Sequence, residues 1–134
     1  HMMSAAIMGA TGFQKGLGAI HALSHPIGAI YHTHHGTTNA VCMPAVLQFN
    51  KPKITGVIEQ ASNYLGIAGG FDGFCAYVDA LNASLGIPKT LAGLGVTDPD
   101  IDRIVAGALN DPSTGGNPVE MTRENTTKLL LQIV

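Results

Sequence analysis

The chain has 134 residues, of which 46% are hydrophobic and only 12% are charged, and its formal net charge is −2. This length fits one domain with a sizeable core, and the near-neutral charge argues against a nucleic-acid-binding protein. Lys15 is the only Lys, Arg, Asp or Glu residue among the first 50, whereas all six histidines lie among the first 35. Polar residues and glycines interrupt every apolar stretch there, so no membrane span is expected.

Helical spacing of apolar residues predicts an all-α fold of about six or seven helices. Residues 4–25 are apolar on every side and predict a helix buried all round, which Pro26 should disturb. Residues 32–36 predict a connecting turn, followed by a second helix over about 37–49. The Lys-Pro-Lys sequence at 51–53 predicts the boundary of that second helix.

In the rest of the chain, apolar residues at helical spacing predict four shorter helices, over 57–68, 71–85, 101–109 and 122–133. A short helical turn is predicted at 88–94 and a loop at 111–118. Gly69 and Gly70 should separate the first two helices. Asp98, Pro99 and Asp100 combine a cap, a proline for the first turn and an early acid, so they predict the start of the third helix.

The histidines are the strongest candidates for chemistry. His21 and His25 are four residues apart on a predicted helix, so both imidazoles project from one face, a common way to present nitrogen ligands to a metal. His35 follows a proline break and could fold back to the same place. The alternative is that these are hydrogen-bonded core or interface groups, and spacing alone leaves both interpretations open. His32 and His34 are expected to be loop residues.

The glycines at 16 and 18 do not form a nucleotide-binding loop. The lysine of this segment precedes the second glycine and no Ser or Thr follows, so the phosphate-loop pattern fails. His21 stands where a dinucleotide fingerprint needs its third glycine. Close packing, or the close approach of a ligand, is the better explanation of these glycines. The isolated Cys42 and Cys75 are typical of buried free thiols in a reducing compartment, so a cytoplasmic location is expected.

Longer motifs around these histidines resemble a known family. Residues 16–29 read GLGAIHALSHPIGA, and residues 35–50 read HGTTNAVCMPAVLQFN. This pattern, G-x-x-H-A-x-x-H-x-x-G-A followed by H-G-x-x-N-A-x-x-x-P, resembles the iron-containing (group III) alcohol dehydrogenases. Residues 85–95 and 111–118 also resemble stretches near the end of that family, so the resemblance covers residues 4–134.

The resemblance implies roles for three histidines. His21 and His35 match two of the four residues that hold the family's metal, and His25 matches a non-ligand histidine near nicotinamide and substrate that is assigned to proton relay. It also implies a divalent iron, with zinc as the alternative, that acts as a Lewis acid on the alcohol oxygen while hydride passes to NAD or NADP. Small alcohols or aldehydes would be the substrates.

The chain departs from the family pattern in two ways. The D-x-x-x-H segment that supplies the other two ligands is absent, and so is the amino-terminal α/β cofactor domain. We therefore expect residues 1–2 to be an expression-vector scar and residues 3–134 to be a partial helical C-terminal domain, inactive as a dehydrogenase on its own. Its uncovered apolar surface should favour self-association. The alternative is a helical binding or assembly module without catalytic activity.

Overall fold

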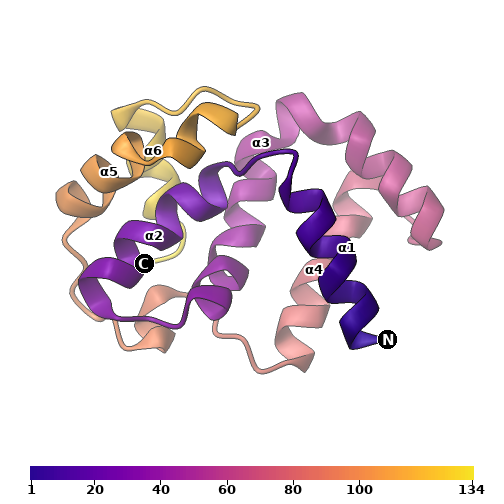
Figure 1. Cartoon of the computed structure of the whole chain (residues 1–134), viewed down its shortest axis with the longest axis horizontal. Coiled ribbons are helices and arrows are strands. Elements are labelled where there is room, and N and C mark those ends of the chain that lie inside the picture. The colour runs from indigo at the N-terminus through magenta and orange to yellow at the C-terminus, as the bar shows by residue number, and fades with distance from the viewer.

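The computed structural model describes all 134 residues and contains helices but no strands (Figure 1). The α-helices are α1 (Met2–Phe13), α2 (Ala19–Tyr31), α3 (His35–Leu65), α4 (Gly70–Ser84), α5 (Ile101–Asn110) and α6 (Arg123–Leu130), and two 3-10 helices are η1 (Leu91–Leu94) and η2 (Pro112–Gly116). The predicted all-α class, with six or seven helices, is confirmed. None of the helices combines the length and the hydropathy that a bilayer crossing requires.

Helix α2 packs against both α3 and α5 (Figure 1). The main core is formed by apolar side chains of α2, α3, α5 and α6, including Leu23, Ile27, Val41, Cys42, Ile104, Val105, Leu129 and Leu130. Pro26 remains inside α2, although a disturbance of the helix was predicted there. A Cβ atom on Gly107 of α5 would lie only 2.7 Å from the Cβ of Pro26, so this glycine allows α5 to pack directly against the proline ring.

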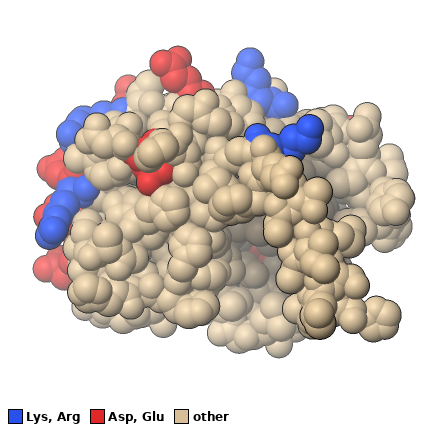
Figure 2. Space-filling view, viewed as in Figure 1, with Lys and Arg blue, Asp and Glu red and all other residues tan.

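The prediction of one buried helix over residues 4–25 is wrong. Helix α1 ends at Phe13 and a non-helical segment precedes α2, because Gly16 adopts a left-handed backbone with φ of +100°. Helix α1 has no buried residue and exposes large apolar side chains, namely Met2, Met3, Ile7, Met8 and Phe13. Figure 2 shows few charged side chains on the part of the surface where α1 lies; they gather mainly at the left edge and the top of the view.

The predicted boundary at residues 51–53 is also wrong, because α3 continues through it to Leu65. Pro44 and Pro52 both lie inside this helix, and each lacks the N–H that would bond to the carbonyl four residues earlier. For Pro44 that acceptor is the Ala40 carbonyl, and the Asn82 Nδ2 of α4 donates to it at 3.0 Å. A tertiary hydrogen bond therefore replaces the missing helical one.

Removal of the Asn82 amide is expected to destabilise the chain. Asn82→Ala leaves the Ala40 carbonyl without this donor and should lower the free energy of unfolding by about 1 kcal/mol. Asn110→Ala is the matched control, because the Asn110 Nδ2 donates to the Ala106 carbonyl within its own helix at an exposed position. Its cost should be below about 0.5 kcal/mol. Urea unfolding followed by circular dichroism measures both, and equal losses would contradict the role given to Asn82.

Candidate functional site

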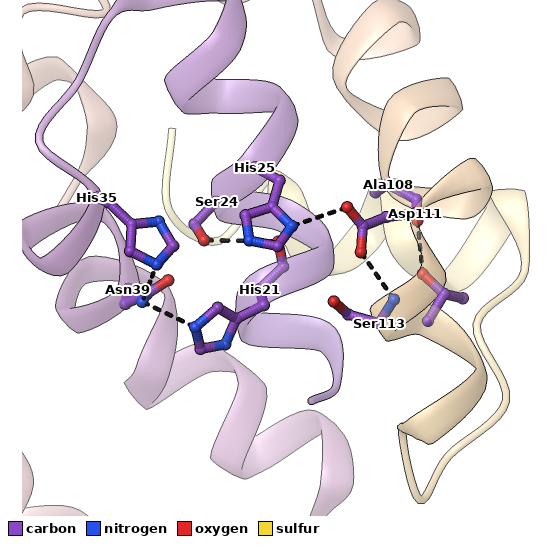
Figure 3. Close-up of polar contacts among 9 residues, drawn as sticks. His21, Ser24, His25, His35, Asn39, Ala108, Asp111 and Ser113 are labelled. Carbon is purple, nitrogen blue, oxygen red and sulfur yellow. Dashed lines mark hydrogen bonds and ion pairs between the residues drawn. The ribbon is translucent and has the colours of Figure 1, made fainter. Parts of the chain in front are cut away.

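Three histidine rings form a cluster where α2 meets the start of α3 (Figure 3). The ring centroids of His21 and His25 are 5.5 Å apart, those of His21 and His35 are 5.2 Å apart, and those of His25 and His35 are 5.5 Å apart. The expected fold-back of His35 onto the α2 pair is therefore present in the structure.

A short reversal of the chain produces this cluster. His32 ends α2 in a left-handed conformation with φ of 58°, and α3 begins three residues later. The His34 Nδ1 accepts a hydrogen bond from the Thr37 backbone N–H at 3.3 Å and so caps α3. The predicted loop position of His32 and His34 is confirmed, and the capping by His34 explains why α3 begins at His35, earlier than the sequence predicts.

A side chain from the far end of the sequence anchors the first turn of α2. The Asn117 Oδ1 accepts the Ala19 backbone N–H at 3.0 Å, and Asn117 also exchanges two hydrogen bonds, of 2.9 and 2.8 Å, with Asn50 of α3. A Cβ atom on Gly18 would lie 2.8 Å from the same Oδ1, so the close-packing explanation of this glycine is confirmed. These contacts fix the start of the helix that carries His21.

His21 and His35 face one amide group. The Asn39 Nδ2 lies 3.3 Å from the His21 Nε2 and 3.1 Å from the His35 Nε2, so both ring nitrogens point toward the same place. Burial of the ring lowers the pKa of His21, electrostatic repulsion from the neighbouring His35 and His25 lowers it further, and Asp111 acts in the opposite direction. The low pKa keeps the His21 ring neutral, which is the form that binds metal ions.

His25 has a carboxylate partner. Its Nδ1 lies 2.8 Å from the Asp111 Oδ2, and the Asp111 Oδ1 accepts the Ser113 backbone N–H at 2.8 Å (Figure 3). Burial acts to raise the pKa of Asp111, but hydrogen bonds from the Ser113 hydroxyl and backbone N–H and from His25 outweigh it, so the pKa lies below its usual value. The carboxylate is therefore ionised near neutral pH and orients the imidazole of His25.

Sequence reasoning found no acidic partner for the histidines and gave Asn39 no role. Asp111 is 86 residues from His25 in the chain, so no local pattern connects the two. Asn39 is four residues after His35, one helical turn away on the same face, and that spacing is the signal that could have identified it.

The donor set fits half of a metal site. Two imidazole nitrogens converge, as metal ligation requires, but no group of three or more His, Cys, Asp or Glu side chains in the chain is placed to hold one ion. Structural and catalytic sites of this kind use at least three protein ligands. The chain alone can thus present two nitrogen ligands, and beside them a histidine oriented by a carboxylate.

Comparison with known proteins gives a consistent assignment. The chain matches the Fe-containing alcohol dehydrogenase family, C-terminal, over residues 1–134. It is 39% identical to the 4-hydroxybutyrate dehydrogenase of Cupriavidus necator, over 98% of this chain and 37% of that protein. It is 36% identical to the lactaldehyde reductase of Escherichia coli (strain K12), over 85% of this chain and 32% of that protein.

Solved structures share the fold. The crystal structure of a 1,3-propanediol oxidoreductase superposes with a TM-score of 0.81 at 27% sequence identity, covering 88% of this chain and 33% of that one. The chain thus spans about a third of the length of these relatives. Since the family match extends over every residue and two relatives exceed a third in sequence identity, the chain belongs to the iron-containing alcohol dehydrogenase family and corresponds to its C-terminal part.

Proposed function

We propose that this chain forms the metal-binding and proton-relay part of an NAD(P)-dependent alcohol dehydrogenase or aldehyde reductase. The observation that carries the proposal is the convergence of the His21 and His35 Nε2 atoms beside a third histidine, His25, that a carboxylate orients. The names of the two curated relatives, a hydroxy-acid dehydrogenase and an aldehyde reductase, support small alcohols or aldehydes as substrates.

His21 and His35 would hold the divalent ion, iron or alternatively zinc, through neutral imidazole nitrogens. When bound, such an ion supplies Lewis-acid polarisation of the substrate oxygen. His25 would move the proton: its side chain is 41% exposed, so it reaches solvent, while Asp111 holds the Nδ1 proton and leaves the Nε2 to accept and release another. NAD or NADP would be the hydride carrier.

The proposal assigns residues 3–134 to a partial helical domain. The other metal ligands and the nucleotide site would lie in the rest of a complete enzyme, so we expect no dehydrogenase turnover from this chain alone. A cytoplasmic location and a vector origin for residues 1–2 stay predictions.

The exposed apolar side chains of α1 favour the second candidate function, a self-associating assembly module. Light scattering of the purified chain would distinguish such an assembly from a monomer.

Titration of the purified, metal-free chain with Zn²⁺ tests the ligand assignment. We expect one weak site per chain, because two nitrogen ligands leave the coordination incomplete. His21→Ala and His35→Ala should each abolish the site, since only one of the two proposed ligands remains. His32→Asn is the matched control, because the His32 side chain is exposed and makes no hydrogen bond, and asparagine tolerates the left-handed backbone of this position. If both cluster variants bound Zn²⁺ as tightly as the unaltered chain, the ligand assignment would be wrong. Isothermal titration calorimetry gives affinity and stoichiometry together.

A further inference from the structure

The side-chain amide of Asn39 contacts both candidate metal ligands, His21 and His35. Asn39 lies on α3 one turn after His35, and its amide nitrogen approaches the Nε2 of both His21 and His35, at 3.3 and 3.1 Å (Figure 3). A side-chain amide nitrogen carries two hydrogens, so one amide group can donate to both rings. Its oxygen, the Asn39 Oδ1, is buried and has no hydrogen-bond partner.

This contact restricts where each imidazole carries its proton. In the orientation that the structure shows, the Asn39 amide nitrogen faces both rings, and an amide N–H is accepted only by a ring nitrogen with a free lone pair. In this arrangement the Nε2 of each neutral ring is unprotonated and the proton sits on Nδ1. A metal ion binds that same unprotonated nitrogen. Asn39 thus selects in both rings the tautomer, and the direction of the lone pair, that metal binding needs.

The Asn39 amide is able to turn away from the two rings, because no hydrogen bond holds its oxygen. Because the Asn39 Oδ1 makes no hydrogen bond, the contacts with His21 and His35 are the polar interactions that fix the orientation of the amide. The amide and a metal ion compete for the same two lone pairs, so the amide must turn away when an ion binds. A second polar anchor on the oxygen would oppose that movement, and the structure provides none.

We propose that Asn39 is a positioning residue that holds His21 and His35 in the Nδ1–H tautomer, with both Nε2 lone pairs converging, and so prepares them to bind a divalent metal ion. The tautomer selection is a property of the metal-free chain. Its relevance to metal binding rests on the proposed function.

Nuclear magnetic resonance of the metal-free chain tests the selection directly. Long-range ¹H–¹⁵N correlation spectra of ¹⁵N-histidine-labelled protein identify the protonated nitrogen of each ring, recorded near pH 8.5, about two units above the ordinary imidazole pKa. We expect the Nδ1–H form for His21 and His35. In Asn39→Ala both rings should lose this selection, and in the nearly isosteric Asn39→Asp they should shift to the Nε2–H form, because a carboxylate only accepts.

Two internal controls separate this effect from a loss of structure. His25 donates from Nδ1 to Asp111, so it should stay in the Nδ1–H form in every Asn39 variant. Asn63→Asp makes the same chemical change at an exposed position of the same helix and should alter none of the three rings. The proposal is overturned if His21 and His35 are in the Nε2–H form in the unaltered chain, or if neither Asn39 variant changes their tautomers while His25 is retained.

The Zn²⁺ titration distinguishes failure of this inference from failure of the proposed function. Selected tautomers in a chain that binds no Zn²⁺ would refute the metal-binding function and leave the positioning by Asn39 intact. Zn²⁺ binding that depends on His21 and His35, without tautomer selection in the metal-free chain, would support the function and overturn the role of Asn39.

Discussion

Replacement of Asn117 by alanine is expected to lower the free energy of unfolding by about 3 kcal/mol, the largest loss of stability that we expect from removing one polar side chain. Its amide accepts hydrogen bonds from the Ala19 N–H and the Asn50 Nδ2, and donates to the Asn50 Oδ1 and the Val119 carbonyl. All four bonds disappear together, and the Asn50 side chain, only 6% exposed, is left without its partner.

A double-mutant cycle isolates the contribution of the amide pair. Asn50→Ala should cost less than Asn117→Ala, about 2 kcal/mol, because Ala19 and Val119 keep their bonds to Asn117. In the double variant the two losses should not add, with a coupling of about 1–2 kcal/mol. Chemical unfolding of the four proteins provides the measurement, with the exposed Asn110→Ala as reference. Strictly additive losses, or a loss from Asn117→Ala no greater than the reference, would refute the anchoring role.

The hydrogen bonds of Asn117 also affect the candidate functional site. Asn117 bonds to the first turn of α2, and His21 is two residues after Ala19 in that turn. A cavity of about 300 Å³ opens beside it, lined by residues of this turn, of α3 and of the segment that contains Asn117. Loss of the anchor therefore frees the end of the helix that positions a candidate metal ligand.

Local signals in the sequence predicted much of the fold. The Asp-Pro-Asp sequence predicts the start of α5 closely, but the cap is Asp100 and not Asp98: the Asp100 side chain accepts the Arg103 N–H at 3.0 Å, and Pro99 precedes the helix. Gly66, with φ of 70°, ends α3, and Gly69, with φ of 91°, precedes α4, so a glycine break separates the two helices but begins three residues earlier than the predicted one. In both cases the physical cause lies within a few residues of the boundary, so the sequence contains it.

Two of the wrong predictions, at Pro26 and at residues 51–53, concern prolines whose accommodation depends on distant contacts. The continuity of α3 past Pro52 goes with the packing of Ile54 and Ile58 against the apolar side chains of α4. Pro26 fits inside α2 because Gly107 of α5 leaves room for its ring. The candidate site, too, could be predicted from the sequence only in part. The histidine cluster follows from helical spacing and one turn, whereas the contact of His25 with Asp111 needs the packed structure.

In a complete enzyme with the proposed activity, Asp111→Asn is expected to lower kcat about 10- to 100-fold with little change in KM. The carboxylate accepts the Nδ1 proton of His25 and thereby leaves the Nε2 free to accept another. An asparagine can present its NH₂ group to the Nδ1 instead, which moves the ring proton to the Nε2 and blocks the relay. The variant keeps the size of the side chain, so steric effects are small.

Steady-state kinetics over a range of pH compare this variant with Asp98→Asn, which removes the same charge at an exposed position of the chain. That control should retain full activity. If Asp111 acts through His25, the double variant of Asp111→Asn with His25→Ala should be no slower than His25→Ala alone. Once the His25 imidazole is removed, Asp111 has no ring to orient. A further drop in the double variant would show that Asp111 acts on the reaction by another route, and a rate equal to that of Asp98→Asn would show that the carboxylate has no part in it.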